Sequence, residues 1–483
     1  MMNGYWAVFL LPAAGAIILF LTRKNRVIGP VLMASALIHF AAVAYLLSTG
    51  YDPAAGSWIC PDPPGKLFLA ITSGLFLATA GYTTGFLRRD REKHPRRNDT
   101  NYAGCLLLFL SSMSLACTSG HLGLYWVAIE ATTLASAPLI TLHHTPRSLE
   151  AVWKYLLICS AGIAIALLGI FFLATAAGEG AGDMTIQGLL GNAGSMDLVW
   201  LKASFILLLV GFGTKTGLAP VHTWLPDAHS EAPSMVSALL SGALLNCAFL
   251  GILRGHSICA AAGMGDFSGG LLMIFGILSM LTAGVFMIRQ TDYKRMLAYS
   301  SIEHMGIIAL GTGAGGLAAA GAMLHTVTHS AAKGLLFLTA GKLVWMYDTK
   351  KISAVRGIMS FDPVTGVFWL GGILAVAGTP PFGVFMSEFI VLKGLLEKQQ
   401  PLSVVLYLIS LAFVFVAMTR LVIPMSFGRP SGNRQRPEAG KGDHSILGPA
   451  ALALTLLTAG LFIPASLWKV FTRIAAFMGG SGL

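Results

Sequence analysis

The chain has 483 residues, of which 55% are hydrophobic and only 11% are charged. A soluble domain carries roughly 25% charged residues, so this composition excludes a soluble protein. The apolar runs are also too long for the short alternating segments of an outer-membrane barrel. The 32 basic and 21 acidic residues give a formal charge of +11. In a membrane protein basic residues collect in the cytoplasmic loops. This explains the excess of positive charge, so we expect no nucleic-acid partner.

About fourteen apolar segments are long enough to cross a bilayer as helices, since a span needs ~20 residues. They begin near residues 4, 27, 66, 103, 121, 151, 198, 234, 268, 299, 317, 361, 401 and 446. The sequence therefore predicts an all-α, polytopic membrane protein with about fourteen transmembrane helices.

Basic clusters follow only odd-numbered spans in this count. They lie at Arg88–Arg97, Arg289–Arg295, Lys350–Arg356 and Arg429–Lys441, whereas the alternate loops hold Asp52, Asp62, Glu179, Asp183 and Asp197. Because positive residues collect on the cytoplasmic side, we expect a multi-pass protein of the cell inner membrane. Both termini should then lie on the non-cytoplasmic side.

The six cysteines show neither a C-x-x-C pair nor the spacing of a ferredoxin. Most fall in apolar runs, where cysteine behaves as a small hydrophobic residue. We therefore expect no disulfide framework, no cofactor and no redox centre of the chain's own.

Several ionisable residues fall inside the apolar spans. They are Glu130, Lys215, Glu303, His304, His325, His329, Lys333 and Glu388. A charge at the bilayer centre costs a few kcal/mol or more and usually faces a cavity or a partner. A single such residue can be explained by snorkelling or by a structural ion pair, but their number favours an ion pathway.

Three of these residues are spaced i, i+4 and i+8 along one span: His325, His329 and Lys333. At this spacing they form one stripe about 12 Å long on a helix. Imidazole exchanges protons near neutral pH, and a lysine withdrawn from water releases its proton more readily. The stripe predicts a proton relay. A metal site is the alternative, but no third carboxylate or thiol stands at ligand spacing, so we expect no metal.

Two spans are interrupted beside an ionisable residue. Lys215 is followed by Gly217 and Pro220, and Glu388 is preceded by Gly378, Pro380, Pro381 and Gly383. Broken helices at matching positions of two halves indicate an inverted repeat whose site lies at the breaks. An ordinary proline kink is the alternative.

Three segments resemble a known family. They are KTGLAPVHTWLPDAHSEAPSMVSALLSG at Lys215–Gly242, TDYKRMLAYSSIEHMG at Thr291–Gly306, and HTVTHSAAKGLLFL at His325–Leu338. They resemble the antiporter-like subunits of respiratory complex I and of Mrp-type cation/proton antiporters. Chain length and the run SEAPSMVSALLSGALLN are most similar to the F-type membrane subunit of hydrogenase-4 and formate hydrogenlyase.

This resemblance implies two inverted five-helix repeats, with helices seven and twelve broken. The chain would divide into a three-helix segment at 1–100, repeats at 101–256 and 257–425, and a cytoplasmic loop with the last helix at 426–483. The resemblance also implies that Glu130 on helix five pairs with Lys215 on helix seven, and that Glu388 is the terminal group. Family members carry a central lysine on helix eight or eleven; Asn246 takes the first position here, so Lys333 must serve.

The resulting prediction is a proton-translocating membrane subunit of a redox-driven complex, of the hydrogenase-4, formate hydrogenlyase or NADH:quinone oxidoreductase type. Protons would pass along Glu130, Lys215, His325, His329, Lys333 and Glu388, with His222, His229, Glu303 and His304 in support. Other membrane and peripheral subunits would supply the driving force. The alternatives are a stand-alone or Mrp-type sodium/proton antiporter, a quinone-reducing enzyme, and a membrane scaffold.

Overall fold

The computed structural model describes residues 4–50, 53, 56–93, 98–142, 144–178, 184–429 and 446–479. Within these ranges the regular structure is helical and the only β contacts are isolated bridges, so the predicted all-α fold is confirmed. Parts of two predicted cytoplasmic loops, residues 94–97 and 430–445, lie outside the described residues, as do Asp52, Glu179 and Asp183.

The helices from Tyr5 to Ala261 include the first eight predicted spans. They are α1 (Tyr5–Thr22), α2 (Ile28–Ser48), α3 (Pro63–Lys93), α4 (Thr100–Thr118), α5 (Leu122–Ile140), α6 (Pro146–Ala177), the short α7 (Ile186–Gly191), α8 (Leu198–Thr216), α9 (Trp224–Glu231), α10 (Ser234–Leu239) and α11 (Leu245–Ala261). A π-helical turn, η4 (Leu240–Leu244), joins α10 to α11.

The second part continues in the same way. It contains α12 (Gly265–Met287), α13 (Tyr293–Ala314), α14 (Gly316–Tyr347), the single turn α15 (Ile358–Phe361), α16 (Pro363–Val376), α17 (Gly383–Glu397), α18 (Pro401–Phe427), α19 (Leu447–Leu461) and α20 (Ala465–Met478). Single 3₁₀ turns lie at Asn25–Val27, Ala193–Ser195 and Ile352–Ala354.

Ten helices of the described chain are long and apolar enough to cross a membrane by themselves. The bent pair α19 and α20 adds an eleventh candidate if it counts as one span. The remaining predicted spans correspond to α13, to α14 and to the pair α16 and α17. Each of the fourteen predicted segments therefore matches one helix or one interrupted helix.

Helix starts follow from local sequence, because short polar side chains accept hydrogen bonds from the first free backbone N–H groups. Asp197 caps α8, with Oδ1 accepting from the N–H of Val199 at 2.8 Å. Asp292 caps α13 in the same manner at 2.7 Å, and Asp362 caps α16. The caps set the register of the helices that carry Lys215 and Glu303.

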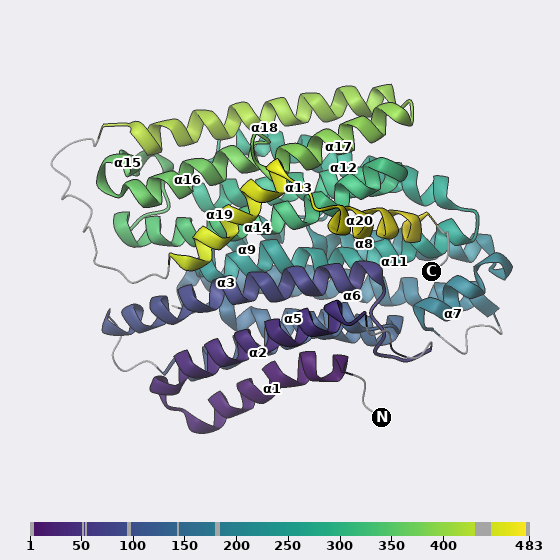
Figure 1. Cartoon of the computed structure of the whole chain (residues 1–483), viewed down its shortest axis with the longest axis horizontal. Helices are drawn as coiled ribbons and strands as arrows, with labels where there is room; N and C mark the ends of the chain where they lie inside the picture. Colours follow the sequence, from purple (N-terminus) through teal and green to yellow (C-terminus); the bar gives the residue numbers. More distant parts are fainter. Residues whose placement is uncertain are drawn as a thin grey trace.

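The helices form a central group that others surround (Figure 1). The apolar window of α10, η4 and α11 is 100% buried, whereas that of α18 is only 33% buried. Nearly all of α13 and α14 is buried as well. Figure 1 shows α1 and α18 at opposite edges of the bundle, with α13, α14 and α11 between them. Large apolar side chains exposed on the outer helices fit contact with lipid.

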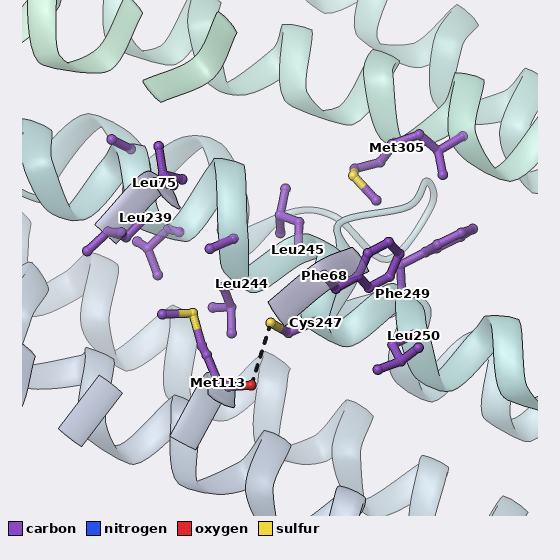
Figure 2. Packing of buried hydrophobic residues seen from close by; sticks show 14 of the residues in the cluster. Phe68, Leu75, Met113, Leu239, Leu244, Leu245, Cys247, Phe249, Leu250 and Met305 are labelled. Carbon is purple, nitrogen blue, oxygen red and sulfur yellow. Dashed lines mark hydrogen bonds between the residues drawn. The ribbon is translucent and has the colours of Figure 1, made fainter. Parts of the chain in front are cut away.

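Figure 2 shows how tightly the central group packs. Phe68 of α3 and Met113 of α4 approach the α11 residues Leu245 and Cys247. The Cys247 thiol lies 4.0 Å from the carbonyl oxygen of Met113 and 3.6 Å from the Cys117 thiol. Helix α11 is thus packed closely against the N-terminal helices α3 and α4.

The last span differs from the single helix expected from the sequence. It consists of α19 and α20, which meet at an angle of 82°. Phe462–Pro464 separates them, and Pro464 can neither donate a backbone hydrogen bond nor continue a helix through the preceding residue. The end of α19 lies against the break between α16 and α17: a Cβ atom at Gly460 would overlap the carbonyl oxygen of Pro381.

A buried ion pair joins the start of α3 to α11. Asp62 accepts from Arg254 Nε at 2.8 Å and from Arg254 Nη2 at 3.1 Å, and also from the N–H of Gly65 at 2.9 Å. Arg254 has no exposed surface. Removing one partner of such a pair leaves an uncompensated charge in the protein, which is strongly destabilising.

We expect Asp62→Asn to lower the stability of the purified chain by about 3–5 kcal/mol, seen as a lower apparent Tm in detergent. The double variant Asp62→Leu with Arg254→Met removes both charges and should recover most of the loss. Lys393→Met, which breaks an exposed pair with Glu397, is the control and should change nothing measurable. An unchanged Tm for Asp62→Asn would contradict this role.

Candidate functional site

Lys215 lies at the end of α8 with no exposed surface. Its Nζ donates to the hydroxyl of Thr133 at 2.9 Å and to the hydroxyl of Tyr155 at 2.6 Å. Nζ also lies 4.5 Å from the centre of the Tyr155 ring. The ammonium group is therefore held by neutral oxygens and an aromatic ring.

Glu130 of α5 reaches Lys215 through an intermediate side chain. The Thr133 hydroxyl donates to Glu130 Oε2 at 3.4 Å while it accepts from Lys215. Ser160 of α6 donates to Glu130 Oε1 at 2.8 Å. The expected Glu130–Lys215 pair is thus brought together, but as a carboxylate and an ammonium on either side of one hydroxyl.

The break after Lys215 is built by Gly217, whose φ of 81° is a left-handed conformation that favours glycine. A Cβ there would overlap the side chain of Leu225. Past Pro220, the chain re-enters a helix at Trp224, whose indole N–H donates to the Thr214 carbonyl oxygen at 2.7 Å. The same carbonyl group also accepts from the N–H of Gly217 at 3.2 Å, so the indole bond ties α9 to the last turn of α8.

Lys333 occupies the middle of α14 and is fully buried. Its Nζ donates to the carbonyl oxygen of Leu297 at 3.2 Å and to the hydroxyl of Ser300, both on α13. Like Lys215, it is surrounded by neutral oxygens. Glu303 follows one turn after Ser300 on the same helix.

Asn246 of α11 contacts the same helix as Lys333. Its amide Nδ2 donates to Ser330 Oγ at 2.8 Å and to the Gly242 carbonyl oxygen at 3.0 Å. Its Oδ1 is buried without a hydrogen-bond partner among the described residues. An asparagine thus stands beside α14 at the position where the resemblance leads us to expect a lysine.

Three histidines form a buried cluster next to Lys333. His304 Nδ1 and His325 Nε2 share a hydrogen bond of 2.7 Å, and their rings stack at 4.8 Å. The His329 ring lies 5.1 Å from that of His304, and His329 Nε2 lies 3.2 Å from the carbonyl oxygen of Ser241 in the π-helical turn. His304 of α13 therefore connects the two α14 histidines.

Glu388 lies at the other end of this cluster. Nδ1 of His325 hydrogen bonds to Ser387 Oγ at 2.8 Å, and Ser387 directly precedes Glu388 on α17. The Glu388 carboxylate rests on Gly378, where a Cβ would overlap it and where φ is 66°. The break containing Pro380 and Pro381 therefore leaves room for a buried carboxylate.

The remaining predicted residues are His229, His222 and Glu303, and each has at least one buried side-chain atom without a hydrogen-bond partner among the described residues. His229 of α9 stacks on Phe337 of α14 at 5.2 Å, and both of its ring nitrogens are buried without a partner in the part of the chain that the structure describes. His222 lies in the connection between α8 and α9, and its Nδ1 is unpartnered within the same ranges. Glu303 Oε2 lies 3.9 Å from His304 Nε2. His229 thus packs against α14, the helix that carries Lys333.

Sequence reasoning missed the hydroxyl groups that join these residues: Thr133, Tyr155, Ser160, Ser300 and Ser387. Hydroxyl side chains are frequent in membrane helices and carry no charge, so nothing in the sequence marked them. It also missed the fully buried Arg254, whose charge inside a span was a usable signal.

No group of three or more His, Cys, Asp or Glu residues suited to hold a metal ion occurs in the described part of the chain. Four of the six ring nitrogens of His304, His325 and His329 make hydrogen bonds within the protein, whereas His304 Nε2 and His329 Nδ1 are buried without a partner among the described residues. The arrangement offers exchangeable protons on imidazole, hydroxyl, ammonium and carboxyl groups in one buried row.

The family model described as "NADH:quinone oxidoreductase/Mrp antiporter, TM" matches residues 119–414. The chain belongs to this family. The match covers both broken helices, the histidine cluster and every residue of the predicted proton row.

Among curated relatives, the Hydrogenase-4 component F homolog of Methylacidiphilum infernorum is 36% identical over 434 residues, covering 88% of this chain and 90% of the relative. The NADH-quinone oxidoreductase subunit N of Desulforudis audaxviator is 28% identical and covers 90% of this chain and 86% of the relative.

Solved structures share the fold at lower identity. A chain of the membrane-bound sulfane sulfur reductase, an archaeal respiratory membrane complex, superposes with a TM-score of 0.86 at 20% identity, covering 98% of this chain and 97% of that one. A chain of complex I from Thermus thermophilus gives 0.83 at 22% identity, covering 99% and 100%. The predicted antiporter-like membrane fold is thus confirmed.

We predict that Thr133→Val breaks the connection between Glu130 and Lys215 and lowers proton translocation at least about tenfold, since a hydrogen bond to a charged group is worth about 1.5–3 kcal/mol. Translocation is measured as acidification of proteoliposomes that contain the assembled complex. Thr132→Val is the matched control, because the Thr132 hydroxyl bonds instead to the Ile129 carbonyl oxygen of its own helix. Equal translocation by the two variants would exclude the bridging role.

Proposed function

We propose that this protein translocates protons as an antiporter-like membrane subunit of a redox-driven complex, of the hydrogenase-4 or formate hydrogenlyase type. One observation carries the proposal: Lys333, His329, His304, His325 and Ser387 form a nearly continuous buried row that ends beside Glu388. The identity of 36% to a hydrogenase-4 component F homolog supports the type of complex.

The surroundings of Lys215 and Lys333 allow each lysine both to hold a proton and to release it. Lys215 and Lys333 each bond to neutral oxygens, so no direct carboxylate contact within the described residues locks the proton in place. The Glu130 carboxylate stabilises Lys215 from beyond the Thr133 hydroxyl. At an effective dielectric near 20 such an attraction is worth about 2–4 kcal/mol over ~4–8 Å.

Separating Glu130 from Lys215 therefore removes an attraction that helps to hold the proton on Lys215. The proton would move past His229 toward Lys333 and the histidine cluster. Glu388 would be the last acceptor, beside the break between α16 and α17. Redox reactions in other subunits would supply the energy that separates the pair.

We also propose that the protein lies in the cell inner membrane with both termini on the non-cytoplasmic side, since the basic residues of its loops favour this orientation. Other membrane and peripheral subunits are its partners. We also propose the division into five-helix repeats at 101–256 and 257–425. It is supported by the two breaks, since α8 with α9 and α16 with α17 each form the fourth span of their repeat.

An Mrp-type sodium/proton antiporter component is the second candidate. A Na(+)/H(+) antiporter protein of Alkalihalophilus pseudofirmus is 31% identical over 359 residues, but this chain spans only 43% of that relative. Sodium prefers several hard oxygen ligands, whereas the central row presents mainly imidazole and amine nitrogens. This chemistry favours protons.

We predict that Lys333→Arg abolishes proton translocation by the assembled complex, because guanidinium keeps its proton. Lys333→Ala should fail equally, while Asn246→Ala should be mild. The measurement is proton uptake per electron pair in proteoliposomes, with and without sodium. Full translocation by Lys333→Arg would leave Lys333 as a structural charge, and a strict need for sodium would favour the antiporter.

A further inference from the structure

A cavity of about 630 Å³ lies where α3, α5, α9 and α14 end and α13 begins. Its lining extends from Thr145 and Asp348, which are exposed, to Lys294, which is only 3% exposed. Hydroxyl and carboxylate side chains line it together with apolar ones. A polar space of this size is large enough for several water molecules, since each occupies about 30 Å³ in the liquid. The cavity therefore gives water a path from the protein surface to a buried ammonium group.

The basic loops indicate on which side of the membrane this cavity opens. Three of its lining residues, Asp90, Lys294 and Lys350, belong to the basic clusters that follow odd-numbered spans. Clusters of this kind mark cytoplasmic loops. The cavity thus opens on the side that we propose to be cytoplasmic. None of its described lining residues belongs to the row from Lys333 to Glu388.

Lys294 forms the inner wall of the cavity. Its Nζ donates to the carbonyl oxygen of Ala232, in the connection between α9 and α10. This partner is a neutral oxygen, as are the hydrogen-bond partners of Lys215 and Lys333. Lys294 therefore has the same kind of hydrogen-bond partner as the two lysines of the proposed proton row.

Lys350, the other lysine of the cavity lining, is held differently. Its Nζ lies 2.8 Å from Glu231 Oε1 and donates to the carbonyl oxygen of Ser230 at 3.0 Å. The Ser230 hydroxyl donates in turn to Asp292 Oδ2 at 2.7 Å. These contacts fix the end of α9, and with it the carbonyl group that Lys294 binds. Because a carboxylate holds the charge of Lys350, Lys294 is the better proton carrier of the two.

His229 of α9 lies within electrostatic reach of two lysines, Lys294 and Lys333. It stands one turn before Ala232, whose carbonyl group Lys294 binds. Its ring stacks on Phe337, one turn after Lys333 on α14. Both ring nitrogens are buried without a hydrogen-bond partner among the described residues. An imidazole in this state can accept a proton on one nitrogen and release a proton from the other.

We propose that protons enter the row from this cavity, with Lys294 as the group that takes them up and His229 as the group that passes them toward Lys333. The inference rests on the proposed translocation of protons. Water in the cavity protonates the neutral amine of Lys294, and the resulting ammonium group protonates one ring nitrogen of His229. The imidazolium then releases a proton from its other nitrogen toward a neutral Lys333. Each step moves one proton and returns its donor to the neutral form.

Lys294→Arg in the assembled complex separates proton uptake from a structural role. Arginine keeps the charge and still donates hydrogen bonds, but guanidinium does not release its proton. We expect translocation in proteoliposomes to fall about a hundredfold, the lower end of what a positioned proton-transfer group contributes, while redox turnover continues. Lys342→Arg is the matched control and should translocate as wild type does, because Lys342 pairs with Asp362 and lies outside the cavity lining.

If arginine does not fit the site, chemical replacement of the amine decides the question. In Lys294→Cys, 2-aminoethyl methanethiosulfonate attaches a primary amine to the thiol and should restore translocation. The membrane-impermeant trimethylammonium analogue attaches a charge without an exchangeable proton and should restore none. It should react from the cytoplasmic face of the vesicles, where the cavity opens, and not from the other face. Treated wild type, with its six native cysteines, is the control.

The outcomes separate this inference from the proposed function. Wild-type translocation by Lys294→Arg, or its restoration by the trimethylammonium group, would make Lys294 a structural charge. Reaction of Lys294→Cys only from the opposite face, or from neither face, would show that the cavity is not the entrance. An active Lys294→Arg beside an inactive Lys333→Arg would refute this inference alone. A wild-type complex that moves no protons would refute the proposed function as well.

Discussion

The interior of a bilayer offers no water to polar groups, so a charged side chain within it must find its partners inside the protein. In this bundle the partners of the two central lysines are neutral. Thr133 and Tyr155 hold Lys215, and Ser300 with the Leu297 carbonyl oxygen holds Lys333. Neutral partners satisfy the hydrogen-bonding capacity of an ammonium group without the strong Coulomb attraction of a carboxylate. A buried lysine with such partners is stable in place and still able to give up its proton.

Interruptions in the helices supply the other half of this arrangement. Regular helices use all of their backbone groups internally, so free carbonyl groups and local space arise only at breaks and wide turns. The π-helical turn η4 between α10 and α11 places the Ser241 carbonyl oxygen against His329, and the break between α16 and α17 makes room for Glu388 beside Gly378. The end of α19 rests on that same break at Pro381. Three interruptions are therefore grouped around the histidine cluster and its end.

The sequence was sufficient for much of the fold and for the charged members of the row. Long apolar runs located every predicted span, and charges within those runs identified Lys215, Lys333 and Glu388. The hydroxyl bridges could not be predicted, because Thr133 and Ser387 differ from other polar residues of their helices only in which way they face. The position of His304 between His325 and His329 depends on how α13 packs on α14, which periodicity along one helix does not contain. The bend before α20 was indicated by Pro464 but was missed.

The hydrogen bond between His304 and His325 is the most direct point at which to test proton conduction. The measurement is protons translocated per electron pair by the assembled complex in proteoliposomes, for His304→Gln beside His256→Gln. His304 and His256 are both buried and hydrogen bonded to a neighbouring side chain. His256 of α11, however, bonds to Ser268, which lies outside the row from Lys333 to Glu388. Glutamine can form hydrogen bonds but does not exchange a proton near neutral pH. We predict that His304→Gln loses translocation while redox turnover continues, and that His256→Gln is unaffected. Wild-type translocation by His304→Gln would show that protons do not pass through this hydrogen bond.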